Sequence, residues 1–304
     1  MNRENIITVN FPADCRFIDN FEPFNKLING IIDKSRDVKL NPIERFEFEF
    51  DLTRVTRLDS SAINVMLTLA NYLNLSGFNV RGSVPIDREA RDFMVNSGFF
   101  AMVRSPHKIH PTDDHFFTLS GNNQTNQDAI ANEIRNIMQY LIGESVSYQP
   151  LYNTLGEIAG NSVEHANKDN LYKNWFMSVH YEGSKAIIMM ADIGKGILGT
   201  LNLLLRQRVY NLINWNKPQE TLKKLFEGEY QSCTREPNRN NGLPEMMELV
   251  NKNYIKNVVV VTNDAVLDFK GNSSCQLNIS FPGTFYLIEV TEENIRLWQN
   301  RQKQ

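Results

Sequence analysis

Two hydrophobic periods alternate along the first third of the chain. Residues 46–52, FEFEFDL, alternate apolar and acidic positions, which is the period of a strand with one buried face. SSAINVMLTLANYLNLSG then places apolar residues at helical spacing, and Ser60 or Ser61 is expected to cap this helix. FNVRGSV predicts a second strand, and DREARDFMVNSG predicts a second helix. This order of elements predicts a small α/β domain over residues 1–105.

A second series of elements follows a linker at residues 106–117, which is rich in proline, histidine and aspartate. NQDAIANEIRNIMQYLIG and residues 149–166 have a helical period, and WFMSVHYEG and SKAIIMMADIG predict strands paired through a Gly-Ser turn. GLPEMMELVNKN predicts another helix, and NVVVVTNDAVLDF, CQLNISF and GTFYLIEV predict three more strands. The pattern indicates a second α/β (α+β) domain over residues 118–290, followed by a tail, residues 291–304, with a short exposed helix.

Candidate chemistry begins in LGEIAGNSVEHAN, where Glu157, Asn161 and His165 are spaced four residues apart. Residues at this spacing project from one face of a helix. An amide oxygen suits Mg²⁺, which prefers oxygen ligands and is often held by few protein groups together with substrate phosphates. A carboxylate one turn away can accept a proton from an attacking hydroxyl or water. Taken alone, the three residues also fit a solvated helix face that ends in a packed histidine.

A second candidate motif is DIGKGI, which follows the apolar run AIIMMA. Asp192, at the expected end of a strand, can accept a hydrogen bond from the exocyclic amine of a base. Gly194 and Gly196 permit close approach of a ligand to the backbone. GKGILG also matches the dinucleotide-binding pattern GxGxxG, but the polar segment around Pro218 is not the acid-terminated strand that this fold requires. The P-loop pattern GxxxxGK[ST] does not occur in the sequence.

EIAGNSVEHAN, DIGKGI, NNGLPEMMELV and FPGTFYLIEV together resemble, in order, the sequence boxes of the GHKL ATPase and kinase superfamily. The likeness is closest to the anti-sigma-factor serine kinases and implies a Bergerat-type α/β sandwich that binds ATP and Mg²⁺. It implies that Asn161 ligates Mg²⁺, Glu157 is the general base and Asp192 holds the adenine amino group. It also implies that Thr284 supports Asp192 through water. The further nucleotide contacts that it implies are His165, Gly194, Gly196, Ile197, Gly242 and Leu243.

The first domain has a resemblance of its own. FEFDLTRVTRLDSSAINVMLTLANYLNLSGFNV is similar to STAS domains, in which a DSSG-like turn begins a helix and carries a phosphorylatable serine. This likeness makes Ser60 and Ser61 candidate phosphoacceptors. A serine at a helix N-terminus is expected to be exposed, and its phosphate would be stabilised by the helix dipole and the free N–H groups. The alternative is that one of them is only a helix cap.

These features predict an ATP- and Mg²⁺-binding regulatory protein with ATPase or protein serine kinase capability. Its nucleotide state would control partner binding through the STAS-like domain; the alternative is a non-hydrolysing, ATP-dependent interaction switch. A protein partner or a homodimer is expected. A net charge of −3 gives no support for nucleic-acid binding. Three scattered cysteines, with no signal peptide and no membrane-spanning run, predict a cytoplasmic protein without a membrane segment.

Overall fold

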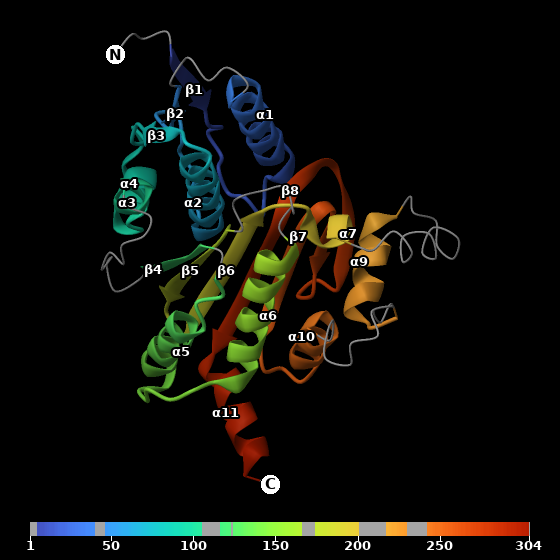
Figure 1. Cartoon of the computed structure of the whole chain (residues 1–304). Helices are drawn as coiled ribbons and strands as arrows, with labels where there is room; N and C mark the ends of the chain where they lie inside the picture. The colour runs from blue at the N-terminus through green and yellow to red at the C-terminus, as the bar shows by residue number, and fades with distance from the viewer. Residues whose placement is uncertain are drawn as a thin grey trace.

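The computed structural model describes residues 5–39, 46–104, 116–122, 124–165, 174–200, 217–229 and 242–303. These residues form two β-sheets with helices around them (Figure 1). The first unit, residues 5–104, contains a parallel sheet in the order β1-β2-β3. The second unit, residues 116–303, contains an antiparallel sheet in the order β4-β5-β6-β8-β7. The protein is therefore of mixed α/β (α+β) class, as the sequence predicts.

In the first unit the predicted strands and helices are confirmed, and β1, α1 and α4 are additional elements that were not predicted. Its elements are β1 (Ile6–Asn10), α1 (Phe21–Lys39), β2 (Glu47–Asp51), α2 (Ser60–Leu75), β3 (Asn79–Gly82), α3 (Arg88–Asn96) and α4 (Phe99–Arg104). Helix α4 was not predicted, because Gly98, with a φ of +72°, ends the helical period after α3. The predicted serine cap of α2 is wrong. Asp59 is the N-cap, and its side chain accepts the N–H of Ala62 at 2.8 Å.

In the second unit the predicted helices and strands are confirmed, and β4, α7 and α9 are additional elements. Its elements are β4 (Phe116–Asn122), α5 (Gln127–Ile142), α6 (Gln149–His165), β5 (Asn174–Glu182), β6 (Lys185–Ile193), α7 (Gly196–Thr200), α9 (Pro218–Phe226), α10 (Gly242–Asn251), β7 (Lys256–Asp268), β8 (Ser273–Thr291) and α11 (Glu292–Gln302). The expected hairpin between β5 and β6 is confirmed. Strand β4 begins inside the expected linker, and the two last predicted strands form one continuous strand, β8.

Both faces of the antiparallel sheet are buried. Alternate residues of a strand point to opposite sides, so one strand contributes to both hydrophobic clusters. On one face, Ile187, Met189 and Ala191 of β6 join a hydrophobic cluster with α1 and α2 of the first unit. On the other face, Ile188 and Met190 join a cluster with α5 and α6. Figure 1 shows α6 lying in front of this sheet. The unbroken apolar run AIIMMA is thus a strand between two layers, and the two units share a hydrophobic core.

Helix α2 is buried on nearly all sides because it lies between the two sheets. A polar residue on it is also buried. The Asn64 amide nitrogen donates to the hydroxyl of Ser178 at 2.9 Å and to the backbone oxygen of Phe176 at 3.3 Å, both on β5. Hydrogen bonds of this kind offset the cost of burying the amide nitrogen. Asn64 therefore fixes the position of α2 on the antiparallel sheet.

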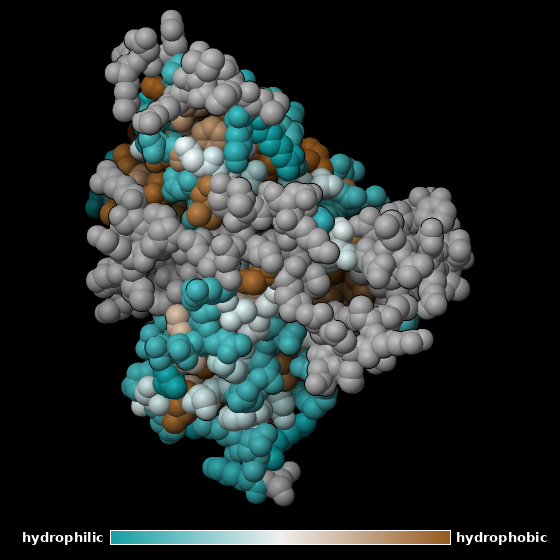
Figure 2. All heavy atoms as spheres, viewed as in Figure 1, coloured by the Kyte–Doolittle hydropathy of each residue, from teal (hydrophilic) through white to brown (hydrophobic). Residues whose placement is uncertain are grey.

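The C-terminal helix was predicted correctly, but it is not a freely exposed tail. Thr291 and Asn294 form a capping box at the start of α11, and Ile295 is fully buried. Trp298 packs edge-to-face on Tyr148 with ring centroids 5.3 Å apart. The outward surface of α11, at the lower end of the view, is hydrophilic (Figure 2). The helix is amphipathic and closes the end of the second core.

Glu133 of α5 gives the fold a measurable pH dependence. It is 1% exposed and accepts hydrogen bonds from Tyr181 and Asn136 at 2.5 and 2.9 Å. Burial raises the pKa of Glu133 to about 7 from 4.5. Between these values the folded state binds the proton more tightly than the unfolded chain. The free energy of unfolding is therefore expected to fall as pH rises through this range, by roughly 3 kcal/mol in total.

The Glu133→Gln variant cannot ionise, so its free energy of unfolding is expected to depend much less on pH over the same range. Urea unfolding of both proteins at about pH 5 and about pH 7.5 measures the difference. An unchanged pH dependence in the variant would contradict this role of Glu133.

Candidate functional site

Four of the sequence motifs converge at one end of the antiparallel sheet. Asp192 ends the apolar part of β6 and pairs in register with Thr284 of the neighbouring strand β8. Helix α6 packs over this face of the sheet, and α10 packs against α6. The loop DIGKGI leaves β6 and enters the short helix α7. Elements far apart in the chain therefore bring candidate residues from these motifs to one end of the sheet.

Asp192 is the best-defined polar group of this region. Its side chain is half-buried, and Oδ2 accepts a hydrogen bond from the Ser162 hydroxyl at 2.9 Å. The backbone N–H of Thr284 also donates to this carboxylate. Burial raises the pKa of Asp192 to about 6, and the two hydrogen bonds oppose that rise. The carboxylate is thus held in a fixed orientation, and a further donor from a ligand would favour its ionised form.

The DIGKGI loop is held by backbone hydrogen bonds, and at Gly196 there is no room for a side chain. The N–H of Gly194 donates to the Pro282 carbonyl at 3.1 Å. Gly196 has a φ of +69°, and a Cβ there would stand 2.7 Å from the hydroxyl oxygen of Thr262. The N–H of Ile197 donates to that same hydroxyl at 2.9 Å. Ile197, an expected nucleotide contact, therefore uses its amide within the protein.

Asn263 was not identified from the sequence, although it holds the start of α7. Its side-chain oxygen accepts the N–H groups of Leu198 and Gly199 at 3.1 and 3.3 Å, and its amide nitrogen donates to the Lys195 carbonyl at 2.8 Å. Its own φ is +50°, a conformation that asparagine tolerates better than most residues. The feature of the sequence that could have identified Asn263 is its position directly after the apolar run NVVVVT, at the expected end of a strand.

Glu157 and Asn161 lie on α6 one turn apart, as their spacing predicts. Asn161 is half-buried, and the Glu157 side chain is exposed and reaches the first residue of α10. A Cβ on Gly242 would stand 2.6 Å from Glu157 Oε2, so this glycine allows the close approach of α10 to α6. Leu243 follows it and packs on the second core cluster. His165 ends α6, and its side chain lies outside the described residues.

The donor set constrains how a metal ion would be held. Among the described residues, no three His, Cys, Asp or Glu side chains form a group that could bind a metal ion. A magnesium ion at Asn161 would therefore need oxygens from bound phosphates and water. Mg²⁺ accepts this kind of coordination, in which few protein ligands take part.

Ser60 and Ser61 do not have the environment predicted for phosphoacceptors. They lie in the first turn of α2, whereas the other candidates lie on α6, β6, α7, α10 and β8. Ser60 is 9% exposed and Ser61 2%, and Ser61 donates to the Asp59 carboxylate at 2.7 Å. The expectation that a serine here is exposed is wrong, because α2 lies between two sheets. In this conformation neither hydroxyl is accessible to a phosphate donor.

No protein-family model matches this chain, and no curated protein sequence matches it. Among the described residues, no helix has both the length and the apolar character needed to cross a bilayer.

Proposed function

We propose that this protein binds ATP together with Mg²⁺ and uses the nucleotide to control a protein interaction. In this proposal the second unit is a GHKL-type ATP-binding sandwich, and the first unit is a STAS-like domain through which a protein partner or a second copy binds. The observation that carries the proposal is the Asp192 carboxylate, which is half-buried at the end of β6 and oriented by Ser162 and Thr284.

A fixed carboxylate in this position suits the amino group of adenine. Ser162 and Thr284 supply the protein donors to Asp192 and leave acceptor capacity for a donor from a ligand. Adenine offers an exocyclic amine, whereas guanine carries a carbonyl oxygen in the corresponding place. The proposed site therefore selects ATP over GTP.

The loop after Asp192 supports the same proposal. Gly196 lacks a side chain where any Cβ would meet Thr262, and Asn263 anchors the backbone of the residues that follow. The backbone path next to the carboxylate is therefore set before a ligand arrives. An adenine base that reaches Asp192 would contact a loop that does not need to reorganise. This lowers the free-energy cost of ordering the site on binding.

In this proposal the phosphates of ATP lie beside α6. Bound Mg²⁺ would neutralise the charge of the phosphates, with Asn161 contributing an amide oxygen. Glu157, one turn away and exposed, is placed to accept the proton of an attacking water. The water oxygen forms a bond to the γ-phosphorus, the bond to the β,γ-bridging oxygen breaks, and ADP leaves with that electron pair. The products are ADP, phosphate and a protonated Glu157.

The attacking group is proposed to be water or a serine of another protein. Phosphorylation within the chain is disfavoured because Ser60 and Ser61 are buried at the start of α2. Each needs a rearrangement of α2 before it could reach a phosphate donor. The proposed activity is therefore either ATP hydrolysis or the phosphorylation of a serine on a partner protein.

Incubation with Mg²⁺ and γ-labelled ATP tests the proposal and the role of Glu157. Wild-type protein is expected to bind ATP and release labelled phosphate, or to label an added protein partner. Glu157→Gln keeps the size of the side chain without its basicity, so turnover is expected to fall roughly 100-fold or more. ATP affinity is expected to stay within about threefold, because the variant retains the Asp192 contact.

The matched control is Glu144→Gln, an exposed carboxylate between α5 and α6, which is expected to behave as wild type. Label that stays in tightly bound ATP would favour the non-hydrolysing switch. A wild-type protein that binds no ATP would overturn the proposal.

A further inference from the structure

Phe17 lies in the segment that joins β1 to α1, and its side chain is fully buried. Its ring contacts Phe285 with centroids 5.0 Å apart and Phe281 with centroids 5.5 Å apart. Both partners belong to β8, on either side of Thr284 in the chain. Thr284 donates its N–H to the Asp192 carboxylate. A residue of the first unit therefore packs on the strand segment that orients the proposed adenine-binding group.

The backbone of Phe17 makes a second contact, to the start of α2. Its N–H donates to the carboxylate of Asp59, the N-cap of α2. The same carboxylate accepts the Ser61 hydroxyl and the Ala62 N–H at 2.7 and 2.8 Å. Phe17 therefore contacts both the start of α2 and the segment of β8 beside Asp192.

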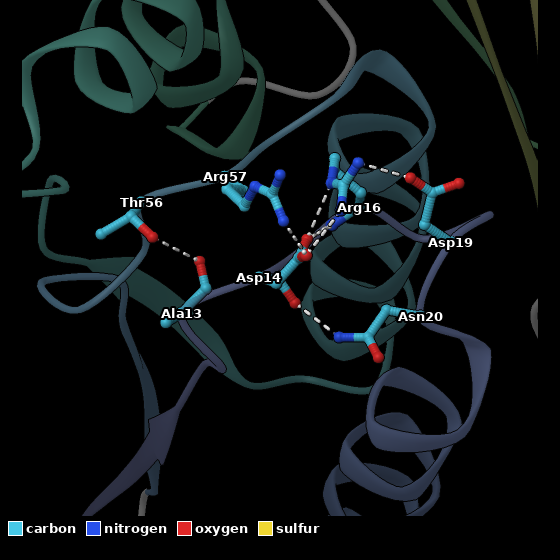
Figure 3. Close-up of polar contacts among 7 residues, drawn as sticks. All are labelled: Ala13, Asp14, Arg16, Asp19, Asn20, Thr56 and Arg57. Atoms are coloured by element: carbon cyan, nitrogen blue, oxygen red, sulfur yellow. Dashed lines mark hydrogen bonds and ion pairs between the residues drawn. The ribbon is translucent and has the colours of Figure 1, made fainter.

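The segment that carries Phe17 is itself tied to the chain before α2 (Figure 3). The Asp14 carboxylate accepts hydrogen bonds from Arg16 at 2.7 and 3.0 Å and lies 3.3 Å from Nη1 of Arg57. The hydrogen bonds from Arg16 hold the pKa of Asp14 at about 2. The N–H of Cys15 donates to the carbonyl of Arg57 at 2.9 Å. These contacts restrict the movement of the Phe17 segment relative to α2.

Helix α1 holds the same strand just before Phe281. The amide nitrogen of Asn25 donates to the Ile279 carbonyl at 2.9 Å, and that of Asn29 donates to the Ser280 carbonyl at 2.8 Å. Asn25 is fully buried. The first unit therefore contacts β8 near Thr284 through the amides of Asn25 and Asn29 as well as through the ring of Phe17.

We propose that Phe17 is a positioning residue for the nucleotide site, which it affects through β8. Its ring fixes Phe281 and Phe285, and this keeps the N–H of Thr284 directed at Asp192. The effect on nucleotide affinity rests on the proposed function, whereas the effect on Thr284 concerns the ligand-free protein. The first unit, besides being a docking module, forms the support behind the adenine-binding strand.

The first test is the Phe17→Leu variant, which keeps an apolar side chain but loses the ring contacts. Amide hydrogen exchange of the ligand-free protein is measured at Thr284, where exchange is expected to become at least about tenfold faster. Affinity for ATP, measured by calorimetry, is expected to weaken roughly fivefold or more. The matched control is Phe48→Leu. Phe48 is fully buried in β2 and packs edge-to-face on Phe78 of the first unit.

The control separates positioning from general loss of stability. Phe48→Leu is expected to leave exchange at Thr284 and ATP affinity within about twofold of wild type. Equal acceleration in the two variants would overturn the inference, and so would wild-type exchange in Phe17→Leu. Faster exchange at Thr284 in a protein that binds no ATP would leave the positioning role intact and overturn the proposed function alone.

A second pair of variants tests the connection if Phe17→Leu does not fold. Asp59→Asn weakens the acceptor of the Phe17 N–H and is expected to accelerate exchange at Thr284 about threefold or more. Asp87→Asn removes the comparable N-cap carboxylate of α3, which accepts the Ala90 N–H at 3.0 Å. It is expected to leave Thr284 unchanged. No difference between these two variants would contradict the role of Phe17.

Discussion

The Asp192→Asn variant is expected to bind ATP roughly 10–100-fold more weakly than wild type, because a hydrogen bond to a charged group contributes about 1.5–3 kcal/mol. Asparagine has the size of aspartate but only one acceptor atom. It cannot accept from Ser162, from Thr284 and from an adenine amine together, and its own NH₂ group would face one of these donors. Isothermal titration calorimetry with Mg²⁺ and ATP measures the loss.

The same experiment includes a nucleotide control and a pH control. Wild-type protein is expected to prefer ATP over GTP, and Asp192→Asn is expected to lose most of that preference. Because the pKa of Asp192 is raised to about 6, the ionised carboxylate that accepts the amine is lost as pH falls through that value. ATP affinity of the wild type is expected to fall with it.

Asp128→Asn, which changes an exposed carboxylate in the first turn of α5, serves as the variant control and is expected to change neither property. Equal ATP affinities of wild type and Asp192→Asn would contradict the assignment of the adenine-binding residue.

Gly283→Ala is expected to have the largest effect on stability of any single methyl addition considered for this site. A Cβ on residue 283 would overlap the backbone carbonyl oxygen of Asp192 and stand 2.8 Å from its carbonyl carbon. Backbone atoms of a central strand cannot move aside without breaking the pairing of β6 with β8. The free energy of unfolding is expected to fall by more than about 4 kcal/mol, a large part of the total for an ordinary domain.

Gly30→Ala is the matched control, because residue 30 is exposed in the middle of α1 and a Cβ there meets no atom within 4 Å. The change is expected to raise the free energy of unfolding by about 0.5–1 kcal/mol, since alanine favours the helix. Urea unfolding of the two variants measures both effects. A Gly283→Ala protein as stable as wild type would contradict the close approach of the two strands.

Local periodicity predicted the elements that carry the site. The run AIIMMA, the helix around Glu157 and the turn at DIGKGI all appear where the sequence places them. The predictions that failed concern features set by contacts between distant parts of the chain. Strand β8 continues through Pro282 and Gly283, which in a sequence look like the end of a strand, because its pairing with β6 is set by residues far away in the chain.

The burial of individual side chains was the main property that the local sequence pattern did not predict. The sequence showed only that α2 carries apolar residues at helical spacing. The helix lies between two sheets, so Ser61 and Asn64 are buried with it. The role of Asn263 depends on a helix start some 65 residues earlier in the chain. The contact of Phe17 with Phe281 joins the two ends of the sequence. Such pairings are tertiary, and no spacing within one segment indicates them.

The sheet face beneath α1 and α2 determines whether the two units can be separated into independent fragments. A fragment that begins at β4 would expose the sheet face formed by residues such as Phe176, Met189 and Val261, which α1 and α2 otherwise cover. A contiguous apolar surface of that kind promotes aggregation. The two units therefore cannot be exchanged as independent modules, and a recombination event that joined the second unit to a different partner would have to supply a new cover for this face.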